Sequence, residues 1–391
     1  MRSVAYINGR VLLESGLHSD RVVIVNGGVI ESIITRDQFA PDEHDITDLA
    51  GNYLAPGFID TQVNGGGGVL FNDSPDIDGI RIIARAHRQF GTTGLLPTLV
   101  SDDIEVIQNG LAAVNNAIEE GVPGVLGIHI EGPFLNNKRR GIHDASKLKK
   151  LTTDIIDKLE PAKNGRSIMT IAPESVEPGM VRQLTEKGFI VCAGHSDATY
   201  DEVSSAVQQG LRGFTHLFNA MSQLGVREPG VVGAALDHDG TWCGIIVDGH
   251  HVSAASLRIA YRCKGPQKLL LVTDAMPPVG SNGSVFHLLG NRITVQDGVC
   301  VDANGTLAGA ALDMASAVRN MMETTACTLS EASAMASTSP ATFLGLQNRT
   351  GAIQVGMQAD FVILDEQLNA VETIIGGQQI WSAINGHFEA P

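Results

Sequence analysis

An alternation of short apolar segments with amphipathic segments runs through the middle of the chain and restricts the folds it can adopt. Most of the apolar segments are followed by apolar residues at helical spacing, as in 80–90, 104–118, 198–209 and 254–263. The strand candidates end at eight polar residues, which are Asp60, Thr98, Glu131, Glu174, His195, His216, Asp248 and Asp274. Eight such units over roughly 300 residues are what a (β/α)8 barrel requires. We therefore expect an α/β fold of the TIM-barrel type, with functional residues at the carboxyl ends of the strands.

Both ends of the chain carry short strand-like segments joined by hairpin turns. These segments lie at 4–7, 21–25 and 29–34, and again at 361–364, 370–375 and 378–384. Asn8-Gly9 and Asn26-Gly27 separate the first group, and Asn-Gly pairs are strong hairpin signals. Neither end alone has enough strands for a stable core. Residues 1–55 and 351–391 are therefore expected to form one smaller β-sandwich domain, with the barrel at 56–350.

A doubly wound open sheet is the structural alternative to the barrel. Such a sheet carries a glycine-rich phosphate turn after its first strand. Gly65 to Gly68 is rich in glycine but has neither a G-x-G-x-x-G nor a G-x-x-x-x-G-K-[ST] pattern. We interpret the segment as a mobile turn, and the barrel stays the preferred fold.

Charge and cysteine content narrow the range of partners and compartments. Lys and Arg number 27 against 43 Asp and Glu, for a formal net charge of -16. This balance disfavours binding to nucleic acid or to an anionic membrane, so an anionic substrate would need a local basic pocket. The five cysteines form no C-x-x-C pair, which fits a reducing compartment, and no apolar run is long enough to span a bilayer. We expect a cytoplasmic protein without nucleic-acid or membrane partners.

Three of the expected strands end in residues of the types that bind metals. Glu131, His195 and His216 close the apolar segments of the third, fifth and sixth strands. If the barrel closes, the strand ends converge around its axis, and these side chains could reach one cation. Three protein ligands with a fourth position open to water are typical of catalytic zinc. A single buried histidine is more often satisfied by nearby backbone, but the recurrence at strand ends favours a metal site.

Asp274 closes the eighth strand, after Leu271-Val272-Thr273. Attack of water on an amide needs a base to take the water proton and an acid to deliver it to the leaving nitrogen. One carboxylate beside the metal site could do both in turn. The alternative is that Asp274 caps the loop or helix that follows it.

Several motifs together resemble the N-acetylglucosamine-6-phosphate deacetylases of the amidohydrolase superfamily, in order along nearly the whole chain. They are Pro56-Gly57-Phe58-Ile59-Asp60, His129-Ile130-Glu131-Gly132-Pro133, Ala193-Gly194-His195-Ser196, Thr215-His216-Leu217-Phe218-Asn219-Ala220-Met221, Asp248-Gly249-His250-His251 and Val272-Thr273-Asp274-Ala275. The first of these marks only the superfamily. The His-Leu-Phe-Asn-Ala-Met and Asp-Gly-His-His segments are much more specific to the deacetylases.

The resemblance implies hydrolysis of the acetamide of N-acetylglucosamine 6-phosphate to glucosamine 6-phosphate and acetate, in amino-sugar catabolism. A metal-activated water would be the nucleophile. It implies that Glu131, His195 and His216 bind the metal and that Asp274 is the general base and acid. The residues implied in substrate binding are His143 at the sugar hydroxyls, Asn219, Ala220, Arg227 and His251 at the phosphate, and Met276. A homodimer is also implied, in which Arg227 could reach the neighbouring subunit's site. Open alternatives are a surface ion pair for Arg227 and a plain loop position for His143.

One departure from many amidohydrolases lies at the end of the first strand. Where a His-x-His pair is usual, this chain has Gln62-Val63-Asn64, and amide side chains are weak zinc ligands. Near the end of the fourth strand lies Glu174, where relatives with two metals place a modified lysine. We expect one divalent cation per subunit, with zinc as the first choice. Gln62 and Asn64 would then hold a water or mark the vacant second position, a substitution that also occurs within the deacetylase family.

Two other functions are weighed against this one. An amidohydrolase acting on a cyclic amide or a nucleobase should show the first-strand histidine pair or the bridging lysine, and neither is visible in the sequence. A catalytically inactive scaffold should have lost metal ligands or the catalytic aspartate. Glu131, His195, His216 and Asp274 all stand in the sequence, which disfavours the scaffold.

Overall fold

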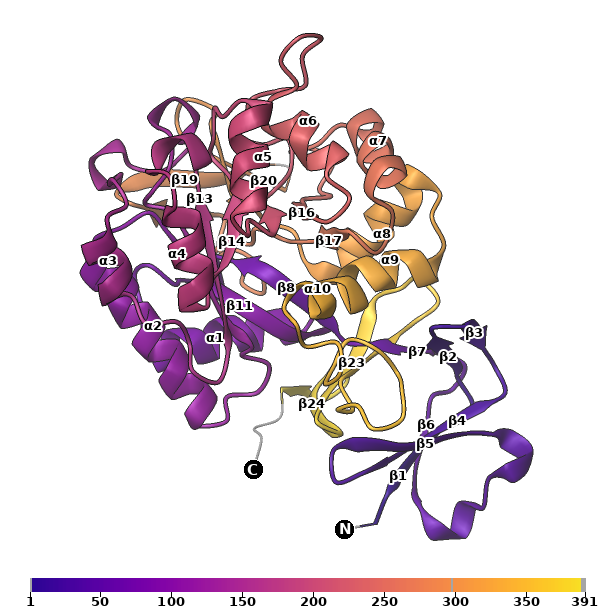
Figure 1. The fold of residues 1–391 in the computed structure, drawn as a ribbon. Helices are drawn as coiled ribbons and strands as arrows, with labels where there is room; N and C mark the ends of the chain where they lie inside the picture. The colour runs from indigo at the N-terminus through magenta and orange to yellow at the C-terminus, as the bar shows by residue number, and fades with distance from the viewer. Residues whose placement is uncertain (1, 297, 388–391) are drawn as a thin grey trace.

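Eight parallel strands form a closed barrel in the middle of the chain (Figure 1). The computed structural model describes residues 2–296 and 298–387. In order around the barrel, the strands are β8 (Phe58–Val63), β11 (Thr92–Val100), β12 (Gly127–Glu131), β13 (Arg166–Ile171), β14 (Ile190–Ala193), β15 (Gly213–Phe214), β16 (Trp242–Ile245) and β17 (Leu269–Leu271). A parallel bridge between Val63 and Ala275 closes the ring between the last strand and the first. The predicted (β/α)8 barrel is confirmed.

Helices surround the barrel strands (Figure 1). They are α1 (Ile77–Arg88), α2 (Ile104–Glu119), α3 (Thr153–Lys158), α4 (Met180–Lys187), α5 (Tyr200–Gln208), α6 (Gly230–Asp237), α7 (Ala254–Lys264), α8 (Met314–Thr325), α9 (Leu329–Ala336) and α10 (Thr338–Phe343). Single 3-10 turns lie at Arg36–Gln38, Pro41–Glu43, Asn137–Arg139, Ala145–Lys147 and Pro173–Ser175. Local sequence sets several helix starts: Asp76 accepts the N–H of Gly79 before α1, and a Thr199–Glu202 capping box begins α5. None of the helices in the described part is long and apolar enough to cross a bilayer.

A smaller domain of two sheets is built from both ends of the chain. One sheet contains β1 (Val4–Ile7), β4 (Arg21–Asn26), β5 (Val29–Thr35) and β6 (Asp45–Asp48). The other contains β2 (Arg10–Leu13), β3 (Gly16–His18), β7 (Tyr53–Pro56), β22 (Phe361–Leu364), β23 (Ala370–Ile375), β24 (Gln378–Ser382) and β25 (Gly386–His387). Tyr6 and Phe361 meet edge to face between the two sheets, with ring centroids 5.4 Å apart. The predicted second sheet domain is confirmed. Its limits at 55 and 350 stay a prediction, and the ends at 1 and 391 lie outside the described residues.

Strand β22 joins the small domain to the barrel because its side chains alternate between two cores. Phe361 and Ile363 are buried in the core of the two-sheet domain. Val362 and Leu364 point to the opposite face and belong to the barrel core. This follows from the period of two in a strand, which sends successive side chains to opposite faces. The small domain therefore supports the barrel instead of being attached by a linker alone.

An antiparallel sheet between β17 and α8 was not anticipated from the sequence. Its strands are β18 (Val285–Leu288), β19 (Asn291–Gln296), β20 (Val299–Val301) and β21 (Leu307–Ala310). Leu288 and Ile293 of this sheet pack with Leu70 and Val100, which follow or end the first two barrel strands. The N–H of Ala310 also donates to the carbonyl of Asp274 at 2.9 Å. These contacts hold the insertion against the carboxyl-terminal mouth of the barrel.

The glycine-rich segment after β8 differs from the mobile turn that we expected. It forms a short hairpin of β9 (Gly65–Gly66) and β10 (Val69–Leu70). Backbone N–H groups of Gly65, Gly67 and Gly68 donate to carbonyl groups of the loop after β17, at 2.7 to 2.9 Å. The hairpin is thus anchored by long-range hydrogen bonds that no local pattern reveals.

Several strands end earlier than the polar residues that we assigned as their last. Strand β13 ends at Ile171, and Glu174 lies in the 3-10 turn beyond it. Strand β16 ends at Ile245, three residues before Asp248. His195 and His216 each lie two residues past their strands. The reason is that backbone pairing stops where the chain bends over the barrel mouth, and the candidate functional side chains lie in these bends.

Candidate active site

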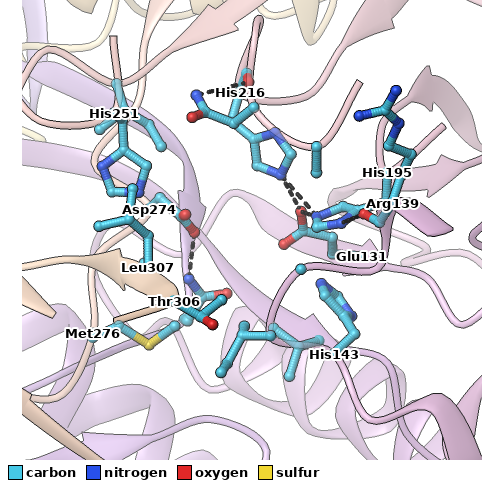
Figure 2. A pocket seen from close by; sticks show the side chains of 18 of the residues that line it. Glu131, Arg139, His143, His195, His216, His251, Asp274, Met276, Thr306 and Leu307 are labelled. Carbon is cyan, nitrogen blue, oxygen red and sulfur yellow. Dashed lines mark hydrogen bonds and ion pairs between the residues drawn. The ribbon is translucent and has the colours of Figure 1, made fainter. Parts of the chain in front are cut away.

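Three buried side chains converge at the mouth of the barrel, as the sequence predicted. Glu131 ends β12, and His195 and His216 follow β14 and β15. Oε1 of Glu131 lies 3.1 Å from Nε2 of His195 and 2.8 Å from Nε2 of His216, and the two nitrogens are 3.0 Å apart (Figure 2). Each residue is at most 6% exposed. Barrel closure has therefore brought side chains from three strand ends to one point.

The chemistry of these three atoms fits a divalent cation. Nδ1 of His195 lies 2.9 Å from the carbonyl oxygen of Arg139. A carbonyl can only accept, so Nδ1 carries the hydrogen and Nε2 presents its lone pair to the cluster. Two imidazole nitrogens and a carboxylate oxygen within 4.8 Å of one another are a donor set that zinc and several other divalent ions take.

The backbone at this cluster is strained. His195, His216 and Asp274 have φ values of 49°, 36° and 51°, in the left-handed region that residues other than glycine rarely adopt. Such strain costs on the order of 1–3 kcal/mol per residue and persists where the surrounding structure enforces it. In each case the bend turns the side chain after a barrel strand into the mouth. The geometry is thus imposed by the fold at the positions that the sequence singled out.

Asp274 lies close to the cluster and is held by two side-chain amides. Nε2 of Gln62 donates to Oδ1 of Asp274 at 3.0 Å and to Oε2 of Glu131 at 3.3 Å. Nδ2 of Asn64 donates to the same Oδ1 of Asp274 at 2.6 Å. We expected these amides to hold a water or to mark a vacant metal position. In the structure they orient the two carboxylates of the site.

Burial and charge shift the pKa values of both carboxyl groups. Burial alone would raise the pKa of Glu131, but its contacts with His195 and His216 lower that pKa well below the usual range. Burial raises the pKa of Asp274, and the nearby charge of Glu131 raises it further. The two carboxyl groups are therefore driven in opposite directions. Such a split is typical of a site with one ligand carboxylate and one proton carrier.

A pocket of about 360 Å³ opens above these residues. The predicted residues that line it are Asn64, Glu131, His143, His195, His216, Asn219, Ala220, His251, Asp274 and Met276. His251 and Met276 lie across the pocket from His143 and His195 (Figure 2). The volume suits a small ligand of sugar-phosphate size.

The histidines at the two sides of the pocket have defined orientations. Nδ1 of His143 accepts the N–H of Ser101 at 3.2 Å, so its Nε2 carries the hydrogen. Burial lowers the pKa of His143 to about 3, with a further effect of His195, so the ring is neutral. On the other side, Nδ1 of His251 lies 2.6 Å from Oδ2 of Asp248. Burial would raise the pKa of Asp248, but this contact lowers it to about 2.

Arg227 is the one predicted substrate residue that lies apart from the pocket. It is exposed in the loop before α6, which projects from the barrel in Figure 1. Val226 beside it is fully exposed, and Leu224 is 59% exposed.

The backbone N–H of Asn219, expected at the phosphate, already donates to the carbonyl of His216 at 3.1 Å.

Sequence reasoning missed several residues that line the pocket. Lys138 and Arg139 come from the loop after β12, and Thr306, Leu307 and Gly309 come from the insertion. The run Lys138-Arg139-Arg140 was a visible signal, because an acidic protein that binds an anion needs local positive charge. For the insertion, Asn304-Gly305 was a hairpin signal that pointed to two further strands.

Most of the chain matches a known protein family. The amidohydrolase family model matches residues 53–381. The chain belongs to the amidohydrolase family. This amidohydrolase is 41% identical to an N-acetylgalactosamine-6-phosphate deacetylase of Shewanella sp. (strain ANA-3), over 97% of this chain and 96% of that protein. The family membership agrees with the divalent-metal site that the Glu131, His195 and His216 cluster fits.

Solved structures of relatives share the whole fold of this amidohydrolase. The crystal structure of N-acetylglucosamine-6-phosphate deacetylase from Pasteurella multocida has a TM-score of 0.92 and 33% identity, over 96% of this chain and 99% of that chain. A mutant N-acetyl-D-glucosamine-6-phosphate deacetylase from Mycobacterium smegmatis, in complex with N-acetyl-D-glucosamine-6-phosphate, has a TM-score of 0.88 and 29% identity, over 96% and 98%. The barrel and the small domain are thus arranged as in these enzymes.

Proposed function

We propose that this amidohydrolase removes the acetyl group of N-acetylglucosamine 6-phosphate, giving glucosamine 6-phosphate and acetate. The observation that supports this most is the convergence of Glu131, His195 and His216 beside Asp274, in a pocket that also holds His143 and His251. The names of its full-length relatives agree with a hexosamine-phosphate amide as substrate. They favour this function over hydrolysis of a cyclic amide or a nucleobase.

Glu131, His195 and His216 would hold one divalent cation, with Zn²⁺ as the first candidate because two nitrogens and one oxygen suit it. When bound, such a cation supplies Lewis-acid polarisation of the substrate carbonyl and of water. Gln62 and Asn64 stand where a histidine pair would bind a second ion, and both amides donate to Asp274. One cation per subunit is therefore proposed.

Asp274 would act as the proton carrier. Its raised pKa makes the carboxylate a better base than an exposed aspartate, and its acid form lasts to higher pH. It would take a proton from the attacking water and return it to the leaving nitrogen. The hydrogen bonds from Gln62 and Asn64 both reach Oδ1, so Oδ2 is left for proton transfer.

The walls of the pocket would orient the sugar and its phosphate. Nε2–H of His143 would donate to the substrate. His251 and the Asn219–Ala220 loop would hold the phosphate, and Met276 would lie beside the sugar. Arg227 lies on an exposed loop, so we propose that it completes the phosphate site of a second subunit in a homodimer. Binding of the phosphate at a distance would fix the acetamide against the reacting groups.

The galacto epimer is a second candidate substrate. The 41% identical relative is named for N-acetylgalactosamine 6-phosphate, which differs from the gluco compound at a single hydroxyl group. Residues of the insertion, including Thr306 and Leu307, line the pocket and would meet the sugar ring. In either case the free cysteines, four of them buried and one exposed, fit action in the reducing cytoplasm.

Metal analysis and acetate release test this proposal together. Purified protein would be assayed with N-acetylglucosamine 6-phosphate and with its galacto epimer, alongside the variant Asp274→Asn. We expect about one divalent ion per chain in both proteins and a loss of turnover on the order of 100- to 10,000-fold in the variant. Undiminished acetate release by Asp274→Asn would rule out Asp274 as the proton carrier. If the natural protein released acetate from neither substrate, the proposed deacetylation would be ruled out.

A further inference from the structure

Glu174 joins two loops on either side of His195. Its Oε1 accepts the side-chain Nδ2 of Asn136 at 2.8 Å and the backbone N–H of Asp197 at 2.6 Å. Its Oε2 accepts the hydroxyl of Ser196 at 2.7 Å. Asn136 belongs to the loop after β12, and Ser196 and Asp197 belong to the loop after β14. One carboxylate thus bridges the segments that carry Glu131 and His195.

These bonds are part of a closed ring that passes through His195 itself. The N–H of Asn136 donates to the carbonyl of His195 at 3.0 Å, and Nδ1 of His195 donates to the carbonyl of Arg139 at 2.9 Å. Nε of Arg139 donates to Oδ1 of Asp197 at 2.9 Å, and the N–H of Asp197 returns to Glu174. The ring therefore holds the backbone of His195 and also its imidazole.

This ring of hydrogen bonds can hold His195 in a backbone conformation and a side-chain orientation that it would not keep by itself. This residue has a left-handed backbone with φ of 49°, which the chain would relax if nothing enforced it. Rotation of the His195 imidazole would also remove the Nδ1–H contact that directs the lone pair of Nε2 to the cluster. Glu174 does not line the pocket and is not one of the converging ligands. Its effect on the site must therefore pass through the ring.

We infer that Glu174 is a positioning residue that fixes His195 in the geometry for binding the cation. The inference rests on the proposed use of His195 as a metal ligand. Outer partners of ligating histidines set ring orientation and ligand basicity, and their loss costs about 10- to 100-fold in metal affinity. A carboxylate suits this position because both oxygens accept, and together they serve three donors.

The test measures Zn²⁺ affinity of the full-length apoprotein by competition with a chelator, together with the melting temperature of the apoprotein. Glu174→Ala should bind Zn²⁺ about 10- to 100-fold more weakly than the natural protein. Glu174→Gln keeps one acceptor oxygen and should recover most of the affinity. The matched control is Glu331→Ala. Glu331 also accepts from three donors, two in the capping box of α9 and the third the hydroxyl of Tyr261, but it does not line the pocket.

The control separates positioning from a general loss of stability. Glu331→Ala should lower the melting temperature without changing Zn²⁺ affinity. If Glu174→Ala lowers only the melting temperature, or if Glu331→Ala weakens Zn²⁺ binding equally, the positioning role is overturned. Should Glu174→Ala not fold, Asn136→Ala breaks one arm of the ring and should still weaken Zn²⁺ binding. Zn²⁺ affinity does not depend on turnover, so a failure of the proposed deacetylation would be seen separately, as absent acetate release by the natural protein.

Discussion

The side-chain Nε2 of Gln62 lies 3.0 Å from Oδ1 of Asp274, across the seam where the first barrel strand meets the last. The residue that stands in a usual metal-ligand position is thus a hydrogen-bond donor to the proposed proton carrier. The same amide reaches Oε2 of Glu131 at 3.3 Å. A single side chain therefore contacts both Glu131 of the proposed metal site and the proposed proton carrier Asp274.

Replacement of Gln62 by Ala tests this relationship. Without the amide, Asp274 keeps only the donor of Asn64 and can turn away from the attacking water. We expect kcat to fall by about 10- to 100-fold, as a misplacement near 1 Å can do, while the metal content stays that of the natural protein. Metal content and steady-state kinetics measured on the same preparation check this. A variant that loses its metal and its activity together would show that Gln62 acts on the metal site instead.

The phosphate end of the pocket can be tested with His251→Asn. We expect kcat/KM for N-acetylglucosamine 6-phosphate to fall by about 10- to 100-fold, since a charged hydrogen bond contributes about 1.5–3 kcal/mol. The matched control is N-acetylglucosamine, which lacks the phosphate. It should be a poor substrate of the natural protein, and its kcat/KM should fall little further in His251→Asn. Equal losses for both compounds would place His251 at the reacting amide and not at the phosphate.

Removal of the metal should destabilise the protein through the three converging residues. A ligand that binds only the folded state adds about 2.7 kcal/mol of stability at 100 times its Kd. Dialysis against a chelator should lower the melting temperature, and Zn²⁺ should restore it. In His216→Ala the melting temperature should no longer respond to Zn²⁺. A full response in that variant would argue against the site.

Asp60 should make stability depend on pH. It is fully buried, and burial raises its pKa to about 7 from 3.8, although hydrogen bonds from Thr273 and Gln62 act against the shift. The folded state therefore binds a proton that the unfolded state releases, and stability falls as pH rises from about 4 to 7. The loss is at most about 4 kcal/mol. Unfolding free energies of the natural protein and Asp60→Asn at pH 5 and pH 8 check this. The variant should show a smaller fall, and an equal fall would assign the pH dependence to other groups.

Much of the fold could be predicted because its signals are local. Apolar strand segments and helical spacing gave the eight units of the barrel, and hairpin turns at both ends gave the second domain. Residue types predicted the converging cluster, since Glu131 ends an apolar strand and His195 and His216 each follow one. Asn304-Gly305 marks one turn of the insertion of β18 to β21, but its short strands are stabilised by packing on Leu70 and Val100, which are far away in the sequence.

By itself, the sequence determined which chemical groups stand at the ends of the barrel strands, because that depends on the order of residues along one segment. Only the tertiary structure decided which hydrogen-bond partners these groups have. Closure of the barrel turned Gln62 and Asn64 into donors to Asp274, and the approach of two loops gave Glu174 its three donors. Hydrogen-bond partners across a closed barrel are set by the shared geometry of distant strands, and no single segment of the chain encodes that geometry.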